Sequence, residues 1–99
     1  MTQGHWFIEE LKKRDPEFSE LVNAVIGKAQ MADALDRKTK TLIVLALDAA
    51  GGHAEGVKHL AASARSLGAT EAEIIEVMRL AFLVSGIPGL IAGLAAYQE

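Results

Sequence analysis

The chain has 99 residues, carries a formal net charge of −3 and contains no cysteine. Without a thiol it forms no disulfide, no thiolate metal site and no cysteine nucleophile. The main basic cluster is Lys12-Lys13-Arg14, which fits a solvated helix end, so the charge pattern gives nucleic-acid binding no support.

Hydrophobic residues make up 51% of the sequence, although only 5% of it is aromatic. Alanine, leucine, isoleucine and valine supply most of this apolar content, which is typical of closely packed helices. A chain of this size buries only about 60–65% of its unfolded surface within one domain. We therefore expect a homo-oligomer in which subunits cover one another's apolar faces.

The first residues, MTQGHWFIEELKK, lack the basic start and apolar run of a signal peptide, so a cytoplasmic location is expected. Residues 80–97 are eighteen residues without a charge, which reaches the length of a membrane span. The middle of this stretch reads Ser85-Gly86-Ile87-Pro88-Gly89, and its glycines and proline predict a turn between two short helices. We expect two buried helices there and no membrane segment.

The first predicted helix spans residues 6–14, and Asp15-Pro16 follows it. Aspartate is a good N-cap and proline suits the first helical position, so a second helix is expected over residues 16–30. Its apolar residues recur at helical spacing and form one stripe, made of Phe18, Leu21, Val22, Val25 and Ile26.

A third helix is predicted from Asp36, as its N-cap, to Ala50, because Gly51-Gly52 then breaks the chain. The first turn of this helix is basic, which opposes the helix dipole without a local reason. Residues 42–47 are apolar all round, so this helix is expected to be surrounded by protein.

Three further helices complete the prediction. Gly68 suits the left-handed residue that ends a helix, and Thr70 followed by Glu73 is a capping box. Period-two alternation of apolar residues is absent, so no strand is expected. The predicted fold class is all-α with about six helices, of which the last three span residues 54–67, 70–84 and 88–97.

Several groups of residues together carry a family resemblance. They are Ala34-Leu35-Asp36-Arg37-Lys38-Thr39-Lys40 with Leu42-Ile43, then Ala64 with Gly68-Ala69-Thr70, Glu73-Ile74, and Ser85-Gly86 before Pro88-Gly89. In this order they resemble the carboxymuconolactone decarboxylase family, which includes alkylhydroperoxidase D-like proteins. The resemblance covers residues 34–97 of a single domain of residues 1–99, with N-terminal helices in residues 1–33. It implies an all-helical fold and an obligate oligomer, a hexamer first and a trimer second.

The peroxidase branch of this family carries a signature of Glu, eleven residues, Cys-x-x-Cys, three residues and His. Anchored on Gly68-Ala69-Thr70, the signature falls on Thr41, His53, Gly56 and Leu60, so all four residues are changed. Peroxide reduction in that branch requires a thiolate nucleophile and a resolving thiol. We therefore expect no thiol peroxidase activity.

The decarboxylase branch needs no cysteine, but it has to bind a doubly charged lactone and move protons. Its histidine falls on the position of Leu60, whereas this chain has His59 one residue earlier. One residue is about 100° around a helix, so His59 is expected to point in another direction.

Asp48 and His53 form the main candidate pair for acid–base chemistry. Asp48 shares a helical stripe with Thr41 and Leu45, and His53 occupies the vacated nucleophile position just after the Gly-Gly break. In an apolar pocket His53 can take up a proton while Asp48 orients its ring. The structural alternative places Asp48 exposed at a helix end and makes His53 a helix cap.

Glu55 and His59 are four residues apart on one predicted helix, which fits a surface ion pair. The alternative is a metal site with His53 as third ligand, since zinc takes three or four convergent ligands. We expect neither a metal nor a cofactor.

Two functions remain open at this point. The first is decarboxylase-type acid–base catalysis on a small carboxylated compound, with Asp48, His53 and His59 as the candidate catalytic residues. The second is a non-catalytic oligomer that binds a small molecule or a protein partner.

Overall fold

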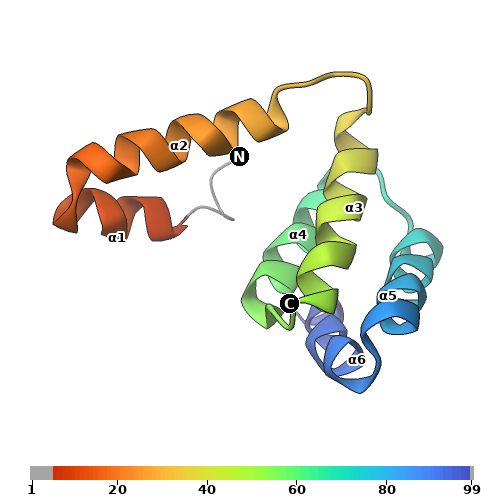
Figure 1. The fold of residues 1–99 in the computed structure, drawn as a ribbon. Coiled ribbons are helices and arrows are strands. Elements are labelled where there is room, and N and C mark those ends of the chain that lie inside the picture. The colour runs from red at the N-terminus through yellow and green to blue at the C-terminus, as the bar shows by residue number, and fades with distance from the viewer. Residues whose placement is uncertain (1–5, 99) are drawn as a thin grey trace. The chain divides into compact units, whose positions relative to one another are not determined.

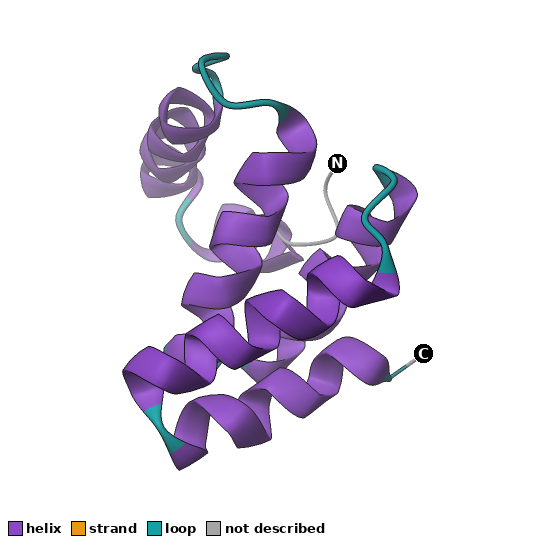
Figure 2. Cartoon of the chain, turned by 90° about the vertical axis from the view of Figure 1, so that its right-hand side faces the viewer, coloured by secondary structure: helices purple, strands orange, loops and turns teal. Residues whose placement is uncertain are grey.

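The computed structural model describes residues 6–98, which form helices joined by short loops (Figure 2). No strand occurs within these residues, which confirms the all-α prediction. The chain divides into two compact units with the boundary between Leu35 and Asp36. The elements are α1 (Trp6–Arg14), α2 (Pro16–Gln30), α3 (Arg37–Ala50), α4 (Ala54–Ser66), α5 (Glu71–Ser85), α6 (Ile87–Gly93) and the 3-10 helix η2 (Leu94–Tyr97) (Figure 1).

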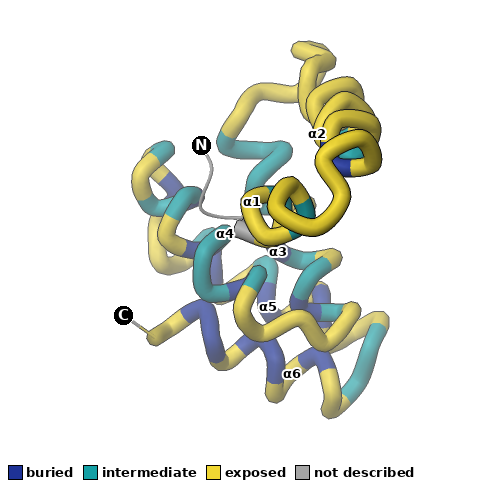
Figure 3. Tube along the Cα trace, turned by 90° about the vertical axis from the view of Figure 1, so that its left-hand side faces the viewer, coloured by how far each residue is buried: buried dark blue, intermediate teal, exposed yellow. Residues whose placement is uncertain are grey.

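The first unit is the helix pair α1 and α2. Asp15 caps α2 as predicted, because its Oδ1 accepts the Phe18 N–H at 3.1 Å and Pro16 opens the helix. Most of the predicted apolar stripe of α2 is uncovered within this unit, with Phe18, Leu21 and Val25 53%, 61% and 69% exposed (Figure 3). The stripe is therefore a surface of the unit and not part of a core.

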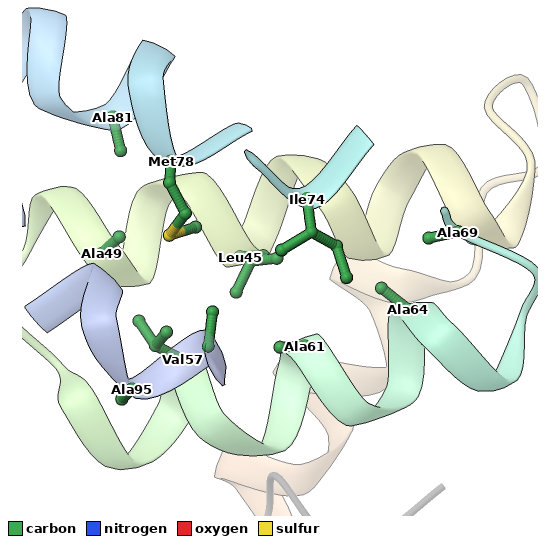
Figure 4. Close-up of a cluster of buried hydrophobic side chains, with 11 residues drawn as sticks. Leu45, Ala49, Val57, Ala61, Ala64, Ala69, Ile74, Met78, Ala81 and Ala95 are labelled. Carbon is green, nitrogen blue, oxygen red and sulfur yellow. The ribbon is translucent and has the colours of Figure 1, made fainter. Parts of the chain in front are cut away.

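In the second unit α3 packs against α4, α5 and α6, and η2 packs against α4. The largest fully buried side chains are Leu45, Ile74 and Val57 (Figure 4). Seven of the eleven residues in this core are alanines, so the helix backbones approach closely. The core consists of Leu45, Ala49, Val57, Ala61, Ala64, Ala69, Ile74, Met78, Ala81, Ala95 and Ala96.

Local hydrogen bonds end and begin the helices where the sequence predicts. Asp36 Oδ1 accepts the Thr39 N–H at 2.7 Å and so caps α3. Thr70 and Glu73 form both bonds of the capping box at the start of α5, at 3.1 and 2.8 Å. Gly68 follows α4 with a φ of 97°, the left-handed conformation expected there.

The basic first turn of α3 has a tertiary explanation. Lys38 Nζ lies 3.1 Å from Oε2 and 3.3 Å from Oε1 of Glu73, at the start of α5. The lysine therefore ties α3 to the capping box of α5, and this ion pair offsets the unfavourable position of the charge at the N-terminus of α3.

The two helices predicted in the uncharged stretch form, but they are not buried as expected. Gly86 turns the chain between α5 and α6 with a φ of 73°. Around this turn Leu83, Val84 and Ile91 are 77%, 83% and 64% exposed. Within one chain, a unit this small covers only one face of each helix, and the other faces are left for the subunit contacts that the composition predicts. Among the described residues, no helix is long and apolar enough to cross a membrane.

Candidate acid–base site

The turn between α3 and α4 brings His53 back beside Asp48. The Gly52 N–H donates to the Ala49 carbonyl at 3.1 Å, and the His53 N–H donates to the Asp48 carbonyl at 2.9 Å. Gly52 has a φ of 81°, which glycine adopts without the steric cost of a Cβ. The Gly-Gly break thus closes α3 and folds His53 over the last turn of the helix.

The side chains of these two residues also meet. His53 Nδ1 lies 3.1 Å from Asp48 Oδ1. An ionised carboxylate only accepts hydrogen bonds, so this contact requires the proton to be on Nδ1. In a neutral imidazole that tautomer leaves Nε2 unprotonated and able to act as a base.

The pair is sheltered on the side of the carboxylate and open on the side of the ring. The side chain of Asp48 is 27% exposed and that of His53 is 68% exposed. Although Asp48 lies in the last turn of α3, its carboxylate lies against Gly56 in the first turn of α4. The positive end of the α4 dipole therefore offsets the unfavourable dipole of α3.

The structural alternative, in which His53 caps α4 and Asp48 lies exposed at a helix end, does not describe the observed side chains. His53 holds the N-cap position of α4, but its side chain makes no capping hydrogen bond. Its ring bonds to Asp48 instead. Asp48, at 27% exposure, is not the exposed helix-end residue of that alternative.

Two other positions of the peroxidase signature serve the helix and the core. Thr41 Oγ1 donates to the Arg37 carbonyl at 2.8 Å within its own helix. Leu60 is partly buried and packs against the hydrophobic core. Neither side chain offers acid–base chemistry, so of the four signature positions only His53 carries an ionisable group.

His59 forms a pair of its own with Glu55. Its Nε2 lies 3.2 Å from Glu55 Oε2, one helical turn earlier, with the two side chains 31% and 70% exposed. This is the predicted i, i+4 ion pair. Within residues 6–98 of one chain, no group of three or more His, Asp or Glu side chains is placed to hold a metal ion.

Several charged groups at helix ends have displaced pKa values. Hydrogen bonds of 2.6 and 3.0 Å from Arg65 lower the pKa of Glu71 and raise that of Arg65. The backbone N–H of Thr70, and then the ammonium of Lys38, lower the pKa of Glu73. These ionised groups stabilise helix starts and helix contacts.

Gly56 is the residue whose contribution the sequence analysis missed. It was considered only as a changed position of the peroxidase signature, whereas in the structure it lies directly against Asp48. The available signal was a glycine inside a predicted helix, where glycine is less stable than other residues and therefore needs a reason.

The fold and the site together define a small all-α protein with an Asp–His pair at a corner between two helices. The carboxymuconolactone decarboxylase family model matches residues 16–99, and the chain belongs to this family. The match begins in α2, before the residue 34 at which the resemblance in the sequence started.

Two proteins are similar to this chain, and one of them is a solved structure of the same family. An uncharacterized protein of Methanocaldococcus jannaschii is 34% identical over 92 residues, which cover 93% of this chain and 86% of that protein. The apo crystal structure of a carboxymuconolactone decarboxylase family protein from Legionella pneumophila superposes with a TM-score of 0.78 at 28% identity, covering 90% of this chain and 80% of the other. The predicted family and fold are therefore confirmed.

Proposed function

We propose that this member of the carboxymuconolactone decarboxylase family catalyses proton transfer on a small carboxylated compound, as a lactone-decarboxylase-like lyase. The supporting observation is the 3.1 Å hydrogen bond between His53 Nδ1 and Asp48 Oδ1. It supplies a base, or after protonation an acid, whose ring is held in one orientation.

Decarboxylation suits such a pair. When the bond to the carboxyl group breaks, carbon dioxide leaves and its electron pair remains on the substrate carbon, which then takes up a proton. The imidazolium of His53 would donate that proton from Nε2 and would recover it from water. Asp48 stabilises the positive charge of the ring before transfer and keeps Nε2 directed away from α3.

The site needs a cover, because acid–base groups act more strongly where water is excluded. His53 is 68% exposed in one chain. On α3, the helix that carries Asp48, Leu47 is 64% exposed, and Ile43 and Val44 are 44% and 45% exposed. We propose that a second subunit covers these apolar residues and closes the site, in a hexamer or, failing that, a trimer.

His59 is the second proton-transfer candidate. Its side chain is 31% exposed, and Glu55 accepts its hydrogen bond at 3.2 Å when the facing ring nitrogen is protonated. We assign it a role only if a substrate bound at His53 also reaches His59, about 1.7 helical turns further along α4. The His59→Ala variant therefore tests whether the substrate site extends from His53 to His59.

The first experiment is native mass spectrometry of the protein purified gently from its own host, which reports the number of subunits and any retained small molecule. Carbon dioxide release from carboxylated lactones is then assayed with the wild-type protein and with His53→Ala, Asp48→Ala and His59→Ala. Asp33→Ala, an exposed acid in the connector before α3, is the matched control. The proposal expects a loss of about 10²–10⁴-fold for His53→Ala. A wild-type rate in His53→Ala would refute it.

The second candidate is an oligomer that binds a small molecule or a partner without catalysis. The exposed ring of His53 and the exposed apolar faces of α5 and α6 favour it. It predicts that a ligand retained in native mass spectra is still retained when every histidine is replaced. Loss of the ligand together with His53 would favour the catalytic site instead.

A further inference from the structure

We infer that Gly56 is a positioning residue for the acid–base pair: its missing Cβ leaves the space from which the Asp48 carboxylate reaches His53. The catalytic meaning of this inference rests on the proposed function. The geometry itself can be tested without any substrate.

The carboxylate of Asp48 is held between two neighbours. Its Oδ1 lies 3.1 Å from His53 Nδ1. Its Oδ2 lies where a Cβ on residue 56 would be, and that Cβ would also be only 2.9 Å from Asp48 Cγ. Any side chain at position 56 would therefore push the carboxylate away, and the oxygen bonded to His53 would move with it.

The backbone gives no other reason for a glycine at this position. The glycines with positive φ in the described chain are Gly52, Gly68 and Gly86, so Gly56 has an ordinary helical conformation. Alanine in a helix interior is more stable than glycine. The sequence gives up that stability at a position where the three heavy atoms nearest to the missing Cβ all belong to the Asp48 carboxyl group.

Gly51 makes a weaker version of the same contribution on the side of the ring. A Cβ there would lie 3.0 Å from His53 Cε1 and 3.2 Å from His53 Nδ1. Both glycines thus leave room for one partner of the pair. The conflict is far more severe at Gly56, so Gly56 is the position to test.

The test reads the tautomer of His53, which a purely structural role of Gly56 would not change. The imidazole nitrogens of ¹⁵N-labelled protein are observed by long-range ¹H–¹⁵N correlation with the ring in its neutral form, and His53→Gln assigns the signal. The wild type should carry its proton on Nδ1. Asp48→Ala and Gly56→Ala should both move the signal toward the Nε2–H form. The matched control is Gly27→Ala, a helical glycine in α2 with open space around it, which should leave the signal unchanged.

Two outcomes separate this inference from the proposed function. If Asp48→Ala leaves the tautomer unchanged, the pair does not form in solution, and the inference and the orienting role of Asp48 both fail. If Asp48→Ala changes the tautomer but Gly56→Ala does not, the inference about Gly56 alone is overturned.

Thermal unfolding supplies a second measurement, which compares the Asp48→Ala variant with the Asp48→Ala, Gly56→Ala double variant. This comparison holds even where Gly56→Ala by itself does not fold. Asp48→Ala removes the carboxylate that would overlap a Cβ on residue 56, so adding Gly56→Ala in that background should raise Tm by about 4–8 °C, and Gly27→Ala should raise it by a similar amount in the wild type. Gly56→Ala alone should not raise Tm. If Gly56→Ala lowers Tm in the Asp48→Ala background, some other contact requires the glycine and the inference is wrong.

Discussion

Replacing Leu45 by alanine tests the packing on which the candidate site depends. Leu45 is fully buried in the middle of α3, and Asp48 lies one turn further along the same helix. The core around Leu45 fixes α3 against α4 and α5. Removing its side chain should loosen the helix that carries one half of the acid–base pair.

The expected cost follows from the burial and from the neighbours. The change removes three buried carbons, worth about 2–2.5 kcal/mol at roughly 0.8 kcal/mol for each. A cavity remains because most of the surrounding core residues are alanines, whose Cβ atoms are fixed to the helix backbones and cannot move in. We therefore expect a total loss of about 3–4 kcal/mol, which is a large share of the 5–15 kcal/mol typical of a domain.

The assay is urea-induced unfolding followed by far-ultraviolet circular dichroism. The subunit concentration is held constant, because assembly would stabilise the folded chain by mass action. Leu45→Met is the matched control, since it conserves volume and should cost less than about 1.5 kcal/mol. A loss below about 1 kcal/mol for Leu45→Ala would refute the reasoning that α3 is held by a close-packed core at this position.

Three further predictions concern redox chemistry, pH and metal ions. The protein should reduce hydroperoxides with a dithiol no faster than a buffer control, because it has no cysteine, and a clear excess over buffer would contradict this. Hydrogen bonds from Thr39 and Arg65 hold the pKa values of Asp36 and Glu71 below their usual 3.8 and 4.5, so the stability these carboxylates add is complete above that range and is lost as pH falls through it. Tm should therefore fall on acidification below about pH 4.5, less steeply in Glu71→Gln, whereas an equal slope in that variant would assign the loss to other groups. Zinc titration should leave Tm unchanged, because within residues 6–98 no third His, Asp or Glu joins His59 and Glu55 to hold a metal ion, and a rise in Tm removed by His59→Ala would reveal a site shared between subunits.

Much of the fold follows from residues that are close together in the sequence. The Asp15 cap, the capping box of Thr70 and Glu73 and the stop at Gly68 were predicted, and the structure confirms them. Each depends on hydrogen bonds or backbone angles within a few residues, so local chemistry determines it. The hydrogen bond between Asp48 and His53 belongs in part to this class, because only a Gly-Gly turn separates the two helix ends.

Other features depend on residues that only the tertiary structure brings together. Lys38 and Glu73 are 35 positions apart, and their ion pair accounts for a charge that looked unfavourable within its own helix. The space at Gly56 exists because α4 crosses α3 at Asp48.

The sequence by itself determined the family and most helices with their caps, and it proposed the Asp48–His53 pair, whereas the last predicted helix, residues 88–97, is α6 followed by the 3-10 helix η2. Only the tertiary structure decided that the Asp48 carboxylate lies against Gly56 and that Leu83 and Val84 are left exposed within one chain. The physical reason is that helix formation and capping depend on neighbours along the chain, whereas burial and steric fit depend on which surfaces come to face each other.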